Sequence, residues 1–241
     1  MIPSVLLTIL IIFISFLGES TFGFGGGFIS IPLLSILLGV KTAIIFVLLF
    51  QFCMGFMLFS TRKHTNWKIA LPITVSITIG TLLGSYMLSF VSSFFLQKFL
   101  AITIFVFLIK MYFFPTITFK DKHTKIVGFF TGLIGGWFQG ITGTSSPIFT
   151  MYLTSLSFTK TTMRATLIYI FFATSVIRVL VSFSEHLITP FILSLALPTF
   201  PFFVLAIYLG HHAHKKLNDK YYRYIVYIVL FLSAITLLLK K

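Results

Sequence analysis

The chain has 241 residues, of which 58% are hydrophobic and only 9% are charged, and its mean hydropathy is +1.08. A soluble domain of this length could not cover its surface with so few charges, so that class is excluded. The net charge of +14 would suit a nucleic-acid partner, but the Lys and Arg residues lie in short stretches between apolar segments, which is typical of a membrane topology signal. We therefore expect a multi-pass protein embedded in a lipid bilayer, with no nucleic-acid partner.

Ten apolar segments follow one another along the chain. Most are long enough to cross about 30 Å of hydrocarbon as α-helices. The first two segments of each half are too short to do so comfortably, and Gly, Ser and Thr separate them, so each pair is either one broken helix or a hairpin of two short helices. The segments lie at 3–17, 27–39, 42–60, 69–90 and 94–114 in the first half, and at 125–140, 146–158, 165–183, 187–209 and 221–239 in the second.

The basic residues decide between these two topologies. If each short pair is a single crossing, nine Lys and Arg residues fall on one side of the membrane and eight on the other. If each pair is a hairpin that enters and returns, 13 fall on one side and four on the other. Basic loops are retained in the cytoplasm, so the asymmetric distribution favours the hairpin model.

An odd number of passes in each half has a topological consequence. With five passes, the second half must enter the membrane upside down relative to the first, as in many secondary transporters. We therefore predict an all-α polytopic membrane protein with two inverted-topology repeats, each a broken Gly-rich hairpin plus three transmembrane helices. The repeats are expected at 1–114 and 126–241, joined by a basic cytoplasmic linker at 115–125.

Gly-rich stretches interrupt both short pairs, as GESTFGFGGG at 18–27 and GGWFQGITGTSSP at 135–147. Irregular backbone at membrane depth is tolerated only where it is buried in protein or lines a wet cavity. A helix that restarts after a break presents free N–H groups that attract anions, and glycines let a ligand approach the backbone. We expect one small midplane anion site, with Pro32 and Pro147 at the helix breaks. The predicted substrate-binding residues are Ser20, Thr21, Gly23, Gly25, Gly26, Gly27, Gln51, Gln139, Gly140, Thr142, Gly143, Thr144, Ser145 and Ser146.

Close helix packing is the alternative explanation for a glycine in a membrane helix. We favour packing for the glycines that occur singly inside the apolar segments, and the anion site for those clustered with Ser and Thr. The single glycines are Gly18, Gly55, Gly80, Gly84, Gly128 and Gly132.

Glu19 and Arg178 are the candidate coupling or gating residues. Glu19 is one of only four acidic residues, and a protonatable carboxylate beside an anion site could couple proton movement to transport. It could instead lie near water or cap the following helix. Arg178 could attract the anion or form a gate, or it could reach the membrane interface or pair with Glu185. Arg164, at the start of its segment, is expected to orient a loop.

The two Gly-rich regions carry a family resemblance. GFGGGFISIPLL at 23–34, GITGTSSPIFTMYL at 140–153 and RATLIYIFF at 164–172 resemble the signature regions of the sulfite exporter TauE/SafE family. The resemblance covers nearly the whole chain in the right order and spacing. It implies a membrane transporter of sulfur-containing anions such as sulfite and organosulfonates. The second region has Thr-Ser-Ser where many members have more glycine, which makes the expected site more hydroxylated.

Our functional hypothesis is a secondary transporter of small sulfur-containing anions in the cytoplasmic membrane, working by alternating access. We favour export, because a basic cytoplasmic surface would gather anions on that side. The sequence has no Walker A motif, so an ion gradient, with a proton or another ion as the coupling ion, or the substrate's own gradient must supply the work; we favour the ion gradient. Alternatives are a channel or structural subunit, or a transporter of a different small anion. We expect no enzyme activity, cofactor or metal, since no catalytic constellation occurs at membrane depth. The sequence leaves the oligomeric state open.

Overall fold

The computed structural model describes residues 2–113, 124–156, 158–213 and 219–239, and every regular element in these ranges is helical. Most of the predicted linker therefore lies outside the described residues. The helices are α1 (Ile2–Phe22), α2 (Gly26–Leu38), α3 (Val40–Met57), the 3-10 helix η1 (Phe59–His64), α4 (Trp67–Phe90), α5 (Ser93–Phe113), α6 (Thr124–Thr142), α7 (Ser146–Thr154), α8 (Lys160–Ser184), α9 (Pro190–Ala213) and α10 (Asp219–Leu239).

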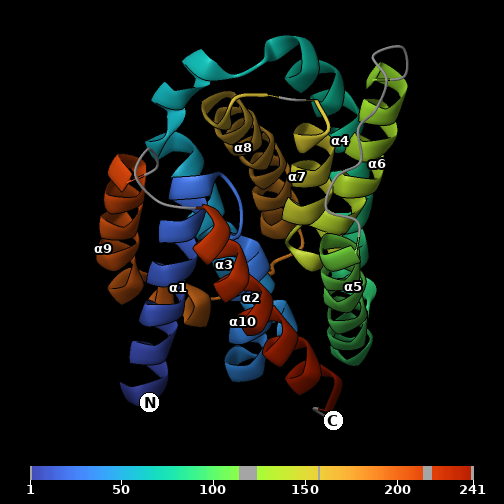
Figure 1. Ribbon diagram of the computed structural model, residues 1–241. Helices are drawn as coiled ribbons and strands as arrows, with labels where there is room; N and C mark the ends of the chain where they lie inside the picture. Colours follow the sequence, from blue (N-terminus) through green and yellow to red (C-terminus); the bar gives the residue numbers. More distant parts are fainter. Residues whose placement is uncertain (1, 114–123, 157, 214–218, 240–241) are drawn as a thin grey trace.

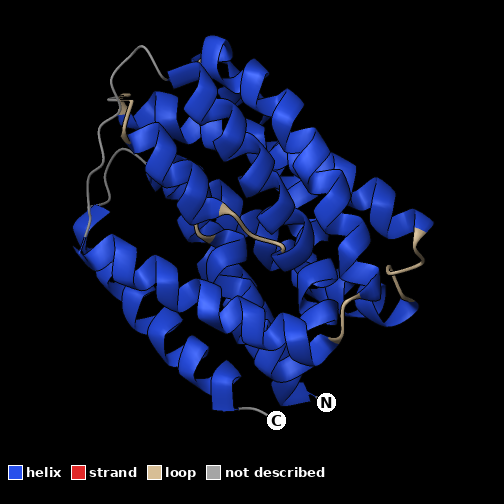
Figure 2. Cartoon of the chain, turned by 90° about the vertical axis from the view of Figure 1, so that its right-hand side faces the viewer, coloured by secondary structure: helices blue, strands red, loops and turns tan. Residues whose placement is uncertain are grey.

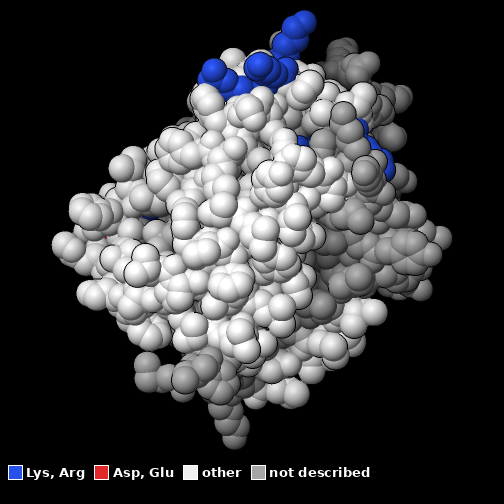
Figure 3. All heavy atoms as spheres, turned by 90° about the vertical axis from the view of Figure 1, so that its left-hand side faces the viewer, with Lys and Arg blue, Asp and Glu red and all other residues white. Residues whose placement is uncertain are grey.

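The helices have the length and surface of a membrane protein. Among the described residues, α1, α3, α4, α8 and α9 contain spans long and apolar enough to cross a bilayer, and α2, α5, α6 and α10 contain shorter apolar stretches. Large apolar side chains are widely exposed, such as Phe90 at 82% and Leu197 at 78%. Figure 3 shows an outer face that is mostly uncharged, with Lys and Arg atoms gathered at one end. The prediction of an all-α polytopic membrane protein is confirmed.

Helix borders in the first half recur in the second. The borders at residues 22, 26 and 40 reappear 120 residues later at 142, 146 and 160, so α1–α3 and α6–α8 have the same spacing. In Figure 1, α1 rises from the N-terminus at the bottom, whereas α6 descends from the top. Each pair, α1–α2 and α6–α7, turns in the interior of the molecule. The inverted-repeat relationship between the halves stays a prediction.

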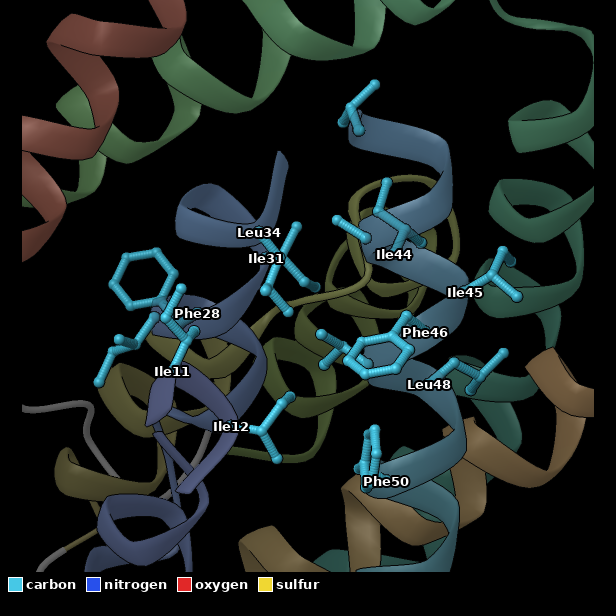
Figure 4. Close-up of a cluster of buried hydrophobic side chains, with 14 of the residues drawn as sticks. Ile11, Ile12, Phe28, Ile31, Leu34, Ile44, Ile45, Phe46, Leu48 and Phe50 are labelled. Atoms are coloured by element: carbon cyan, nitrogen blue, oxygen red, sulfur yellow. The ribbon is translucent and has the colours of Figure 1, made fainter. Parts of the chain in front are cut away.

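Apolar side chains from the first hairpin and α3 form the main core. Figure 4 shows Ile12, Ile31 and Leu34 of α1 and α2 facing residues of α3 such as Phe46. Aromatic contacts extend this core to α9, where the ring of Phe203 lies 5.1 Å from that of Phe16. The first break is therefore held between packed helices rather than exposed to lipid.

Glycines bring α4 and α6 into backbone contact. A Cβ atom added to Gly80 would lie 2.1 Å from the carbonyl oxygen of Leu133, and one added to Gly84 would lie 2.2 Å from that of Trp137. Gly132 on α6 is equally close to the Ser76 side chain. The packing role predicted for these three glycines is confirmed, as it is for Gly55 and Gly128, which lie against Phe172 and Tyr152. This interface fixes the second hairpin against the first half.

Candidate functional site

The first break lies between α1 and α2 and is made by glycine backbone. Gly23 and Gly25 have φ angles of 84° and 112°, in the left-handed region that L side chains rarely adopt. The Gly23 N–H donates to the Glu19 carbonyl at 2.7 Å, which closes the C-terminal turn of α1. The helix runs five residues beyond the predicted segment 3–17, so Glu19 lies in its last turn.

The second break, between α6 and α7, ends its first helix with the same kind of turn. Gly143 has a φ of 82°, and its N–H donates to the Gln139 carbonyl at 3.0 Å. Pro147 lies in the first turn of α7, where a missing N–H is tolerated. Pro32 is not at the helix break as predicted. It lies inside α2, which already begins at Gly26. The first break therefore depends on its glycines.

The two breaks meet in the centre of the molecule, where Figure 2 shows short non-helical segments enclosed by helices. A Cβ atom on Gly27 would lie 3.2 Å from the Gly143 carbonyl oxygen and 2.4 Å from Nε2 of Gln51. Gln51 Nε2 donates to that same Gly143 carbonyl at 3.4 Å. Residues from both halves thus contribute to one buried polar region, as the site hypothesis requires.

Arg178 reaches this region from α8. Its side chain is only 1% exposed, and Nη1 donates to Oε1 of Gln51 at 3.0 Å. Its Nη2 has no hydrogen-bond partner and lies 3.3 Å from where a Cβ of Gly143 would be. The side chain therefore neither reaches the interface nor bonds to Glu185, which lies at the C-terminal end of α8. A buried guanidinium with free donor capacity is costly unless an anion or dipoles compensate it.

Glu19 is buried on the other side of the meeting point, with 1% of its surface exposed. Its carboxylate faces the backbone N–H groups of Gly26 and Gly27 at the start of α2. Its Oε2 lies so close to Gly26 that a Cβ there would overlap it, and this oxygen has no hydrogen-bond partner. Glu19 thus has the geometry of a residue that caps α2, which was one of the alternatives from the sequence, and it is buried away from solvent.

The second break supplies the remaining polar side chains. Ser145 Oγ donates to Oε1 of Gln139 at 2.8 Å, while Nε2 of Gln139 has no partner. Thr142 Oγ1 is bonded to backbone, but Oγ1 of Thr144 has no partner. Ser146, also buried, begins α7. We call Glu19, Gln51, Gln139, Thr144 and Arg178 the polar tip cluster.

Three predicted binding residues have other partners. Ser20 Oγ donates to the Ile207 carbonyl at 2.8 Å and so attaches α1 to α9. Thr21 Oγ1 donates to the Leu17 carbonyl in its own helix at 2.7 Å and lies 3.3 Å from the Gly210 carbonyl of α9. Gly140 packs against α4, because a Cβ there would lie 2.5 Å from the Ser85 nitrogen. All three residues do lie at or next to a break, as the sequence predicted. The sequence cannot show which face of each helix packs against α4 or α9.

Arg164 connects the second half to the first break. Its Nε donates to the Ser20 carbonyl at 2.7 Å, and Nη2 lies 3.3 Å from Nδ1 of His211. The Arg164 Cα is 2.8 Å from where a Cβ of Gly23 would be, which leaves room only for glycine. Arg164 therefore does not only orient its own loop. It also holds the C-terminal end of α1, through its bond to Ser20. The sequence feature that pointed to Arg164 was its position at the start of the membrane segment that follows the broken hairpin.

Multiple membrane-length helices and two broken hairpins that meet at a buried polar cluster define a multi-pass membrane protein of the transporter class. The model of the family described as Sulfite exporter TauE/SafE matches residues 7–237, and the chain belongs to this family of membrane transporters. Neither a curated protein nor a solved structure matches the chain. Among the described residues, no group of three His, Cys, Asp or Glu side chains could hold a metal ion.

Proposed function

We propose that this protein is a secondary transporter that exports small sulfur-containing anions, of the sulfite or organosulfonate class, across the cytoplasmic membrane. The observation that carries the proposal is the buried Arg178, whose unpartnered Nη2 lies beside Gly143 where the two breaks meet. A buried cation without an acidic partner is stabilised by a bound anion. The family name supports sulfite or a chemically similar anion as the substrate.

The transport cycle that we propose is alternating access. The anion binds at the polar tip cluster, and one half then rocks against the other to open the site to either face. Glycines at the breaks suit this cycle because their close backbone contacts, such as Gly27 against Gly143, allow the halves to separate without disengaging large side chains. The basic loops are assigned to the cytoplasm, where they would also raise the local anion concentration.

Glu19 is the proposed coupling residue. It is a buried carboxylate next to the start of α2, and Gly27 at that position also touches Gln51, which binds Arg178. A change in the protonation of Glu19 would therefore alter the charge balance around the anion.

The test is flux of radiolabelled sulfite, sulfate and methanesulfonate in proteoliposomes, with and without an imposed pH gradient. We expect saturable flux of sulfite or methanesulfonate that responds to the pH gradient in the wild type, and flux without that response in Glu19→Gln. If none of the three anions moves faster than in protein-free liposomes, the proposed function is wrong. If Glu19→Gln keeps the pH response, the coupling role is wrong and transport stands.

A further inference from the structure

The two breaks share the turn that ends their first helix, and they differ in side-chain chemistry. Four residues before the glycine that closes the first helix of each pair, a side chain points into the break: Glu19 precedes Gly23, and Gln139 precedes Gly143. One is a carboxylate and the other a neutral amide of nearly the same size. An anionic ligand would therefore meet a carboxyl group at the first break and a neutral amide at the second.

The first break is already filled by a carboxyl group. The N–H groups that begin a helix favour negative charge, and those of Gly26 and Gly27 face the Glu19 carboxylate. The space in front of them is filled, since even a Cβ on Gly26 would overlap Oε2 of Glu19. An anion at the start of α2 would therefore have to displace the Glu19 side chain.

The second break has unused donors in place of a carboxylate. Oε1 of Gln139 already accepts from Ser145, so the free atom of this amide is the donor Nε2. Thr144 Oγ1 and Arg178 Nη2 are also buried without partners, and Arg178 Nη2 lies beside Gly143. Three unpartnered donor groups, one of them a cation, thus lie within or against residues 139–144 and are available to an oxyanion.

We infer that the two breaks are not equivalent: the Glu19 side chain fills the first, and the transported oxyanion binds at the second, with Arg178, Gln139 and Thr144 as its donors. This inference rests on the proposed function. It also narrows the substrate class, because one guanidinium balances one negative charge. A singly charged oxyanion such as a sulfonate fits the second break better than a dianion such as sulfate.

The test is equilibrium binding of radiolabelled methanesulfonate to the full-length protein purified in detergent, with unlabelled sulfate as competitor. Gln139→Glu places a second built-in carboxylate at the second break, and we expect it to weaken binding about tenfold or more. Gln97→Glu in α5, outside the cluster, is the matched control and should bind like the wild type. Glu19→Gln should bind like the wild type, because the amide has nearly the size of the carboxyl group and still fills the first break.

A second pair of variants keeps the test valid if Gln139→Glu fails to fold. Thr144→Val removes one unpartnered hydroxyl at the second break and should weaken binding several-fold. Thr81→Val removes another buried hydroxyl that has no partner, in α4, and should leave binding unchanged. Equal effects of the two valine variants would overturn the inference.

Other outcomes separate the inference from the proposed function. If Glu19→Gln abolishes binding while Gln139→Glu binds normally, the anion is held at the first break and the inference is wrong, although the transporter proposal stands. If sulfate displaces methanesulfonate more effectively than unlabelled methanesulfonate does, the single-charge argument is wrong. If the wild type binds neither these anions nor sulfite, the proposed function fails, and the inference fails with it.

Discussion

At the residue scale, the breaks depend on a few glycines whose backbone no other residue adopts easily. Gly23, Gly25 and Gly143 have positive φ angles, and two of them also lie against the Arg side chains of α8. The sequence identified these glycines because they cluster with Ser, Thr and Pro inside apolar segments. It could not identify Gln51 as the partner of Arg178, because that bond joins residues 127 positions apart.

Gly143→Ala should strongly reduce transport. The alanine Cβ would lie 2.5 Å from Ile31 and 3.3 Å from Arg178 Nη2, in addition to the strain of a positive φ. We expect flux in proteoliposomes to fall about tenfold or more.

The matched control is Gly39→Ala, which has a φ of 83° and nothing within 4 Å of the added Cβ. It also places a side chain on a backbone with positive φ, but without the contact. Similar flux in the two variants would show that crowding at the second break is unimportant.

At the element scale, the α4–α6 interface fixes the second hairpin through backbone contacts. The sequence predicted the packing role of Gly80, Gly84 and Gly132 because each occurs singly in an apolar segment, and the structure adds their partners. The positions of Ser20 and Thr21 could not be predicted, since a hydroxyl near a break serves equally well as a ligand or as a bond to a neighbouring helix. Their bonds to α9 are fixed by how the second half packs against the first.

Gly80→Ala should destabilise the protein. The new Cβ would overlap the Leu133 carbonyl, so α4 and α6 must separate, at a cost of about 1–3 kcal/mol. Thermal unfolding of the purified protein in detergent should show a midpoint several degrees below that of the wild type. Leu83→Ala on the exposed face of α4 is the control and should unfold like the wild type. An unchanged midpoint in Gly80→Ala would mean that α4 and α6 can accommodate a methyl group here, which would contradict the close backbone contact.

At the scale of the whole molecule, the ten helical segments could be predicted because their apolar runs are long and their borders carry Gly, Pro or basic residues. The central arrangement was harder to predict. The count of basic residues predicted that both hairpins turn inside the membrane. It could not predict which polar atoms lack partners, because that depends on contacts between helices from both halves. Composition alone contains no information about those contacts.

The topology can be tested with single cysteines in a Cys53→Ser background, since Cys53 is the only cysteine in the sequence. Lys63→Cys, in η1, should react with a membrane-impermeant maleimide only after the cells are permeabilised, because the basic loops are assigned to the cytoplasm. Ser92→Cys, exposed at the opposite end of α4, should react in intact cells. The reverse labelling pattern would invert the assigned orientation, and equal labelling would contradict a membrane-spanning α4.

The central claim is that the meeting point of the two breaks binds an anion through Arg178. The most direct measurement compares sulfite efflux from proteoliposomes that contain the wild type, Arg178→Gln or Arg62→Gln. Arg178→Gln removes the buried charge, and we expect efflux to fall about tenfold or more. Arg62→Gln changes a guanidinium that stacks on Phe59 and should match the wild type. Wild-type efflux in a folded Arg178→Gln variant would contradict the account.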